Sequence, residues 1–186
     1  MKSVFQFEGR SVLDHGRDVH AWFIDLYIHL TQGTPLHLKW RLPEWIYNPE
    51  FIRRLLPFEI LKTYQIYHDC GKPFCRTVDA DGKQHFPNHA EISYETWMRY
   101  AEIPEDGQIG ELIRMDMLAH TAKGEAVDLF LQHPEAASLI LTGLAEIHSN
   151  ANYLQQLDSD NFKIKFKQLD KMGKKLIAKF NQKTVS

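Results

Sequence analysis

The 186-residue chain has no long uninterrupted apolar segment and only two cysteines. No apolar run approaches the roughly 18 residues of a membrane-spanning helix, which argues against a transmembrane protein. Cys70 and Cys75 are too few for a disulfide framework, so we expect a reducing, cytoplasmic compartment. The N-terminal MKSVFQFEGR lacks the apolar region of a secretory signal. Repeats, low-complexity tracts and flexible linkers are also missing, and we therefore expect a single domain over residues 1–186.

Charge is distributed unevenly, although the formal net charge is only −2. Residues 161–186 contain eight lysines and one acidic residue, a net charge of +7, whereas residues 1–160 carry −9. A lysine recurs every fourth residue opposite an apolar face, which predicts a basic amphipathic helix over about 161–183. Its lysines are Lys163, Lys167, Lys171, Lys175 and Lys179. This face suggests an anionic partner, RNA or DNA, while an intramolecular clamp and a merely solvated surface are the alternatives.

Apolar residues recur at spacings of three and four through most of the chain, as in helices with one buried face. Residues 35–49, with three prolines and two tryptophans, indicate an irregular connector, and residues 70–88 a loop with a turn at Asp-Ala-Asp-Gly-Lys. Pro57 should interrupt one helix, and Pro104 with Gly107 should separate two others. We therefore predict an all-α fold with helices over about 10–31, 50–67, 89–101, 107–122, 125–132 and 134–156.

The most informative segment is Tyr-His-Asp-Cys-Gly-Lys-Pro at residues 67–73. It places His68 and Asp69 side by side at the end of a predicted helix, which we expect Gly71 to terminate. Imidazole nitrogen and carboxylate oxygen together suit a divalent ion such as Mn, Fe, Ni, Co, Zn or Mg. Further histidines stand near other predicted helix ends, and a bundle can bring such ends together: His15, His89 and His120.

The motif HDCGKP, followed by HAE and then by a helix that ends in a histidine, resembles the HD-domain superfamily of metal-dependent phosphohydrolases. It is most similar to the HD domains attached to tRNA nucleotidyltransferases and to related RNA-end phosphatases. The resemblance covers about residues 10–155 and implies an HD-domain-like helical bundle, with residues 33–57 as an insertion beside the site. The metal ligands it implies, for one or two ions, are His15 (or His20), His68, Asp69, His89 and His120. The late acidic ligand of the family is replaced by His148 or by Glu146.

This resemblance implies a hydrolase that cleaves a phosphate ester of a nucleotide or an RNA terminus. The metal would generate hydroxide from bound water near neutral pH and polarise the phosphoryl group. Asp69 would bridge two ions or accept the proton of the attacking water, and Lys72 with Arg53 or Arg54 would neutralise phosphate oxygens. The alternative function is a non-catalytic nucleotide- or nucleic-acid-binding regulator on the same scaffold.

Overall fold

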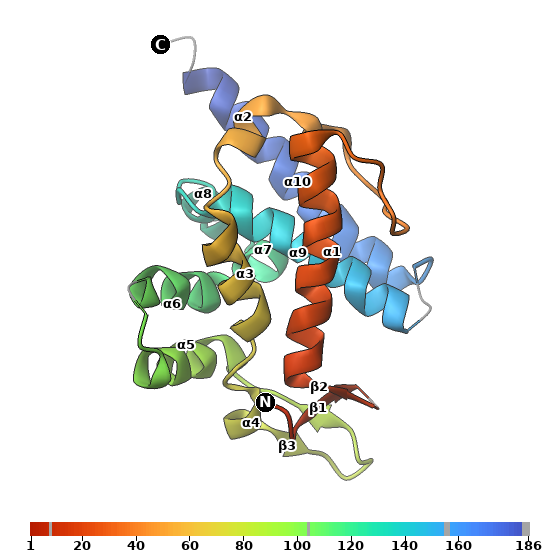
Figure 1. The fold of residues 1–186 in the computed structure, drawn as a ribbon, viewed down its shortest axis with the longest axis vertical. Coiled ribbons are helices and arrows are strands. Elements are labelled where there is room, and N and C mark those ends of the chain that lie inside the picture. Colours follow the sequence, from red (N-terminus) through yellow and green to blue (C-terminus); the bar gives the residue numbers. More distant parts are fainter. Residues whose placement is uncertain (8, 104, 155–156, 184–186) are drawn as a thin grey trace. The chain divides into compact units, whose positions relative to one another are not determined.

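The computed structural model describes residues 1–7, 9–103, 105–154 and 157–183, and this part of the chain is mostly helical (Figure 1). Two short antiparallel hairpins accompany the helices and pair β1 (Phe5–Phe7) with β2 (Arg10–Ser11) and β3 (Thr77–Val78) with β4 (Gln84–His85). The predicted helical class is confirmed. The helices are α1 (Val12–Gln32), η1 (Glu44–Tyr47, 3-10), α2 (Pro49–Arg53), α3 (Phe58–Tyr67), α4 (Lys72–Cys75), α5 (His89–Tyr100), α6 (Asp106–Met115), α7 (Leu118–Thr121), α8 (Glu125–Phe130), α9 (Ala136–Tyr153) and α10 (Asp160–Lys183).

In most places the helices begin and end near the breaks and turns that the sequence predicts. Pro57 separates α2 from α3, as expected, because proline cannot donate a helical hydrogen bond. The turn at residues 79–83 is also present, with Asp79 Oδ1 accepting from the N–H groups of Asp81 at 3.1 Å and Lys83 at 2.8 Å. The predicted helix over 107–122 is instead interrupted between α6 and α7, and the predicted loop contains α4 and the β3–β4 hairpin. Pro104, expected to separate two helices, lies outside the described residues, as do the last two residues of the helix predicted over 134–156.

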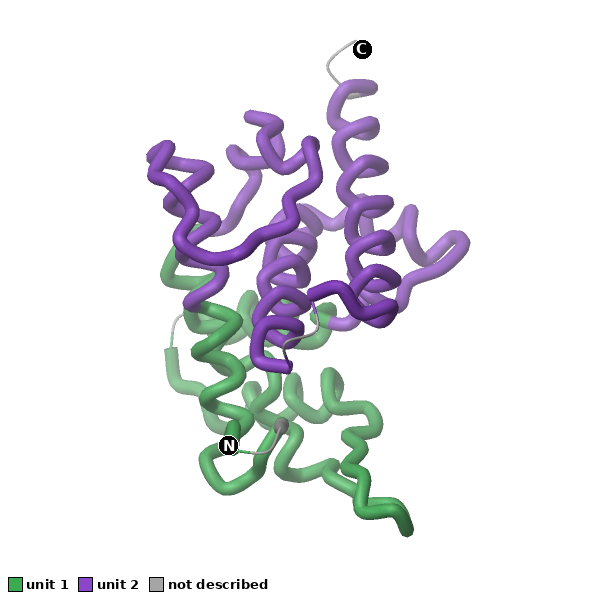
Figure 2. The backbone as a smooth tube through the Cα atoms, turned by 90° about the vertical axis from the view of Figure 1, so that its right-hand side faces the viewer, with its two compact units in different colours: residues 1–20, 57–116 green, residues 21–56, 117–186 purple. Residues whose placement is uncertain are grey.

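The chain divides into two compact units (Figure 2). Unit 1 comprises Met1–His20 and Pro57–Asp116, and unit 2 comprises Ala21–Leu56 and Met117–Ser186. No change in composition marks these boundaries, and the first falls inside the continuous helix α1. The region of HD resemblance is therefore distributed over both units, and the predicted insertion lies almost entirely in unit 2. Across the described residues, no helix combines the length and apolarity needed to cross a bilayer.

In unit 1, α6 packs against α3 and α5, and α4 packs against α5. The core of this unit contains the apolar faces of α3 and α6, including Leu61, Ile109 and Leu112. The first turns of α1 approach α3 closely at Gly16, where a Cβ atom would lie only 2.2 Å from the carbonyl oxygen of Ile66. Glycine at this position therefore permits the two helices to meet.

In unit 2, α9 is almost completely buried and packs along α10. The predicted apolar face of α10 is buried, as Leu169, Met172 and Leu176 show. The 3-10 helix η1 lies against α10 at Gly173, where a Cβ atom would come within 2.1 Å of the Trp45 ring. Trp45 Nε1 also donates to Asp170 Oδ1 at 3.0 Å. The aromatic connector predicted over residues 35–49 is thus anchored on the basic helix.

Candidate functional site

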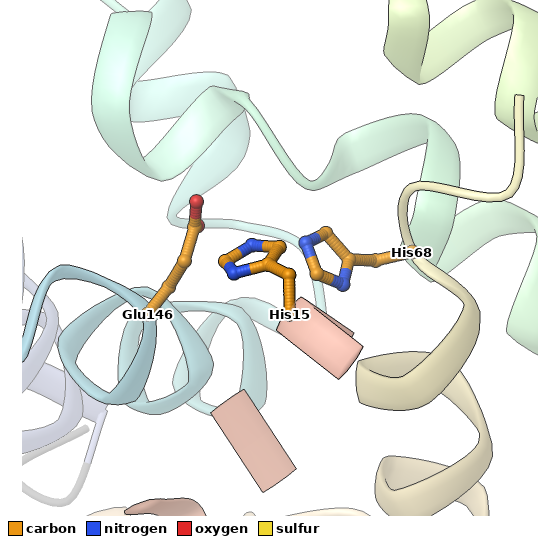
Figure 3. Close-up of side chains that lie close together, drawn as sticks. All are labelled: His15, His68 and Glu146. Atoms are coloured by element: carbon orange, nitrogen blue, oxygen red, sulfur yellow. The ribbon is translucent and has the colours of Figure 1, made fainter. Parts of the chain in front are cut away.

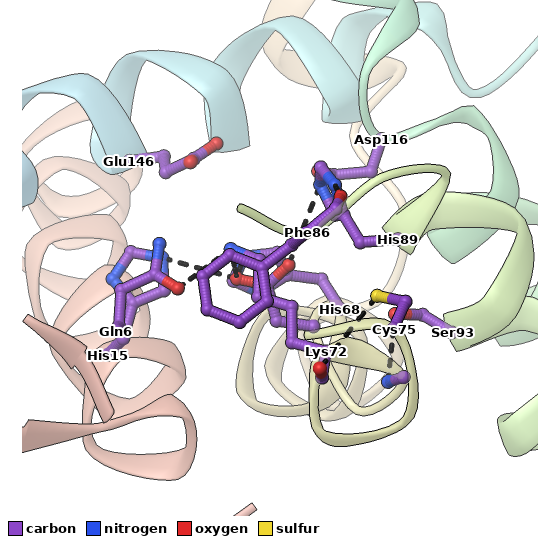
Figure 4. Close-up of polar contacts among 12 residues, drawn as sticks. Gln6, His15, His68, Lys72, Cys75, Phe86, His89, Ser93, Asp116 and Glu146 are labelled. Carbon is purple, nitrogen blue, oxygen red and sulfur yellow. Dashed lines mark hydrogen bonds and ion pairs between the residues drawn. The ribbon is translucent and has the colours of Figure 1, made fainter. Parts of the chain in front are cut away.

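The buried carboxylate of Asp69 is the centre of a polar cluster in unit 1. Figure 4 labels its neighbours His15, His68, Lys72 and His89. The Nε2 atoms of His68 and His15 lie 3.2 and 3.6 Å from its Oδ2, and His89 Nε2 lies 3.8 Å from its Oδ1. Asp69 is 1% exposed, and His15 and His68 are also buried. Four residues predicted as ligands, separated by up to 74 positions in the sequence, are therefore brought together within one unit.

Two backbone features place His15 beside His68. His68 is the C-cap residue of α3, and His15 stands one residue before the glycine that lets α1 approach α3. The two imidazole rings meet edge to face with their centroids 5.3 Å apart (Figure 3). Glu146, also drawn there, belongs to unit 2. Of the two candidates for the first histidine, His20 contacts the side chain of Gln65 at 2.8 Å, whereas His15 faces Asp69.

The tautomers of His68 and His89 are set by backbone carbonyl groups. His68 Nδ1 lies 2.8 Å from the Gln65 oxygen, and His89 Nδ1 lies 3.1 Å from the Phe86 oxygen. A carbonyl oxygen only accepts, so each Nδ1 donates its proton and each Nε2 faces Asp69. Metal-ligating histidines are oriented in this way. Two ligands of one ion, each at about 2.1 Å, lie about 3.0–3.4 Å apart for right-angled to tetrahedral geometry, near the separations found here.

Lys72 neutralises the same carboxylate. Its Nζ lies 2.6 Å from Asp69 Oδ2 and donates to Gln6 Oε1 at 2.8 Å, and the side chain is buried. Burial alone would raise the pKa of Asp69, but the charges of His68 and Lys72 outweigh it and hold the pKa well below its usual range. Asp69 is therefore an anion. The predicted phosphate contact of Lys72 stays a prediction, since here its ammonium group contacts Asp69 and Gln6.

Gly71 acts through its small size. Its φ of −83° and ψ of −15° are ordinary helical values, so left-handed backbone freedom does not explain the residue. A Cβ atom at this position would lie 2.3 Å from the backbone nitrogen of Ser93 in α5. The Gly71 N–H donates to Ser93 Oγ at 2.9 Å, and Cys70 Sγ donates to the Ser93 oxygen at 3.2 Å. Gly71 therefore lets the segment after Asp69 dock on α5, the helix that begins with His89.

Sequence reasoning missed two polar residues of this unit. Gln6 contacts Lys72 from the N-terminal strand β1, and no local pattern indicates this contact. Asp116 is buried, and its carboxylate accepts a hydrogen bond from the hydroxyl of Tyr64. A signal for Asp116 was present, because it continues the buried face of α6 that contains Ile109 and Ile113. An acidic residue at such a position requires a polar partner.

The remaining predicted ligands lie in unit 2. His120 Nε2 lies 3.4 Å from Glu146 Oε2. His148 is fully buried, its Nε2 accepts from the Arg41 N–H at 3.0 Å, and its Nδ1 donates to the Leu144 oxygen at 2.7 Å. Both nitrogens of His148 are thus engaged by backbone groups, and its predicted role as a metal ligand stays a prediction. Of the two replacements considered for the late acidic ligand, Glu146 keeps a carboxylate beside a histidine.

Arg53 and Arg54 also belong to unit 2, where each forms an ion pair of 2.6 Å with Glu50. The Arg54 guanidinium in addition lies over the Phe180 ring, 4.5 Å from its centroid. Their predicted contact with a phosphate at the Asp69 cluster stays untested. The structure instead pairs both side chains with Glu50 of α2, and Arg54 also with Phe180 of α10.

The predicted lysine face is largely exposed on α10, but it does not form a straight line. Lys163, Lys167, Lys171 and Lys175 are exposed, whereas Lys179 is half-buried and donates to the Asp128 carbonyl at 3.1 Å. Successive residues four apart advance by about 40° around a helix, so five lysines turn by about 160°. The expectation that all five share one face is therefore wrong for Lys179.

Comparison of the chain with protein-family models, curated proteins and solved structures finds no match. The resemblance to HD domains thus stays a prediction from the motif residues. A structural observation independent of that resemblance is the grouping of His15, His68, Asp69 and His89 within unit 1.

Proposed function

We propose that unit 1 is the catalytic part of a metal-dependent phosphohydrolase of the HD-domain type. The observation that carries this proposal is the approach of three imidazole Nε2 atoms to one buried, ionised carboxylate. Hydrogen bonds to carbonyl groups orient two of these imidazoles as metal ligands are oriented. His15, His68, Asp69 and His89 would hold a divalent ion, one of Mn, Ni, Co, Fe, Zn or Mg.

The residues around the carboxylate have separate tasks in this proposal. A bound ion would supply Lewis acidity, which activates water and polarises a phosphoryl group. Asp69 offers one oxygen toward His15 and His68 and the other toward His89, so it can serve as a metal ligand. Its lowered pKa makes it a weak acceptor for a proton from water, so the ligand role is the one we propose for it. Lys72 keeps this carboxylate ionised, and Gln6 holds the Lys72 ammonium in place. Imidazole nitrogens grouped around a carboxylate are the donors of a divalent-metal site. They therefore favour metal-dependent hydrolysis over catalysis by a nucleophilic side chain.

The substrate class we propose is a phosphate ester of a nucleotide or an RNA terminus. The exposed lysines of α10 support a polyanionic ligand, since each phosphate contact adds salt-dependent affinity. The same lysines would also serve the alternative function, a non-catalytic nucleotide- or nucleic-acid-binding regulator. That alternative predicts bound metal or nucleotide without turnover.

Metal analysis combined with a hydrolysis panel tests the proposal. The purified protein is supplied with Mn, Ni or Mg and assayed on an aryl phosphate, nucleoside monophosphates and triphosphates, and 2′,3′-cyclic nucleotides. We expect Asp69→Asn to lose bound metal and hydrolysis with its helical circular dichroism retained. Asp81→Asn, an exposed aspartate of the same unit, is the matched control and should keep both.

A second variant is needed in case Asp69→Asn does not fold, because that change leaves the buried Lys72 ammonium without its counter-charge. His89 is more exposed, and His89→Gln should weaken metal binding with little effect on folding. Unchanged metal stoichiometry in both folded variants would contradict the proposal. Bound metal without hydrolysis of any substrate would favour the regulator.

A further inference from the structure

Unit 2 contains a cavity of ≈ 430 Å³ with a cationic and amide-rich polar lining. Its ionisable side chains are those of Arg54, His133 and Lys179, and Gln132 and Gln182 add amide groups. Within the described part of the chain, no aspartate or glutamate lines this cavity. Apolar side chains complete the wall, among them Leu131, Ala137 and Leu176. The cavity therefore combines hydrogen-bond donors for an anion with a surface for an apolar group.

The Arg54 guanidinium is held from two sides. Its Nε donates to Glu50 Oε1 at 2.6 Å, and its plane lies over Phe180, another residue of the cavity wall. Guanidinium carries five N–H donors in a rigid fork, so the bond to Glu50 leaves most of them for another ligand. A side chain that is already oriented loses little conformational freedom when it binds an anion.

Lys179 and His133 are anchored in a similar way. Lys179 donates to the Asp128 carbonyl at 3.1 Å, with Asp128 Oδ1 3.8 Å away. His133 Nδ1 donates to Glu135 Oε2 at 2.6 Å, which leaves Nε2 on the other side of the ring. The acidic partners Glu50, Asp128 and Glu135 lie outside the lining and balance part of the positive charge. Selectivity for an anion would therefore come from directed donors more than from net charge.

We propose that this cavity binds a phosphate monoester attached to an aromatic body, such as a nucleoside monophosphate. The several acceptor oxygens of a phosphate match the fork of Arg54 and the ammonium of Lys179. The apolar wall suits a base or another ring, and the volume lies in the range of small-molecule sites. The site uses none of the residues proposed to bind metal, so this proposal can be tested independently of the hydrolase proposal.

The phosphate monoester has two possible sources with the same chemistry. A free nucleotide would occupy the cavity alone. The 5′-phosphorylated end of a strand would occupy it with the following phosphates near the exposed lysines that precede Lys179 on α10, including Lys171 and Lys175. Binding measurements with both kinds of ligand distinguish them.

Calorimetry on the full chain in EDTA tests the site while metal is removed. The probes are AMP, adenosine, and oligoadenylate with and without a 5′-phosphate. We expect AMP to bind about tenfold or more tightly than adenosine, and Arg54→Gln and Lys179→Gln each to weaken AMP about tenfold. Lys123→Gln, an exposed lysine of the same unit outside the cavity, is the matched control and should leave AMP affinity unchanged. Tighter binding of the 5′-phosphorylated strand than of AMP would assign the site to a strand end, and equal or weaker binding to a free nucleotide.

Lysine acylation read by mass spectrometry gives a second measurement that needs no variant. AMP should protect Lys179 and leave Lys171 reactive, whereas adenosine should protect neither. Equal affinity for AMP and adenosine, or AMP affinity unchanged in both folded cavity variants, would overturn the proposal. Absence of Lys179 protection at saturating AMP would overturn it as well.

Discussion

Buried His148 should make the stability of the protein depend on pH between 7 and 5. Its Nδ1 donates to Leu144 and its Nε2 accepts from the Arg41 N–H, so the structure selects the neutral imidazole. Protonation would place a second N–H against the N–H of Arg41. The rings of Trp40 and Phe162 lie within 5.0 Å of the imidazole, centroid to centroid, and help exclude water. Burial accordingly lowers the pKa of His148 from 6.5 to about 4.

The sign and size of the effect follow from proton linkage. Between pH 6.5 and 4 the unfolded chain binds a proton at His148 that the native protein does not, so the free energy of unfolding falls as the pH falls. For these two pKa values the loss between pH 7 and pH 5 is about 2 kcal/mol. Below pH 4 the native state is also protonated, and this residue adds no further loss.

Urea denaturation at pH 7, 6 and 5, followed by tryptophan fluorescence, measures this loss. His148→Gln removes the titrating group, so its unfolding free energy should fall by about 2 kcal/mol less than that of the parent over this range. Burial also lowers the pKa of His20, but this residue is present in both proteins and cancels in the difference. Equal pH dependence in the parent and His148→Gln would refute the reasoning.

Two further predictions follow from the packing of α1 and from the surface of α10. Gly16→Ala should lower the free energy of unfolding in urea by about 1–3 kcal/mol, because the added Cβ meets the Ile66 carbonyl. At an open helix position the same change would instead stabilise by about 1 kcal/mol. A stabilised variant would therefore show that the helices do not approach so closely. Changing Lys163, Lys167 and Lys171 to Gln should weaken oligonucleotide binding and flatten its salt dependence while leaving aryl phosphate hydrolysis unchanged. Parental affinity at both low and high salt in filter binding would contradict a polynucleotide role for this face.

Local patterns in the sequence were enough to identify most helices and their interruptions. The spacing of apolar residues reports which side of a helix is buried, so α1, α9 and the amphipathic α10 followed from it. Proline chemistry located the break at Pro57, and Asp79 with Gly82 located the turn of the β3–β4 hairpin. The His68–Asp69 pair stood out because an imidazole and a carboxylate side by side at a predicted helix end suit a divalent ion.

Tertiary structure decided which residues those polar groups meet. His148 and His68 both occupy buried helical positions, yet the Nε2 of His148 faces the Arg41 N–H, 107 residues away, and that of His68 faces Asp69. The pairing of Lys72 with Gln6 spans 66 residues, and the cavity around Arg54 and Lys179 joins segments still farther apart. Periodicity cannot report such contacts, because it records only how each residue alternates between solvent and core. The partner, and with it the charge state and chemistry of each side chain, depends on how the helices pack.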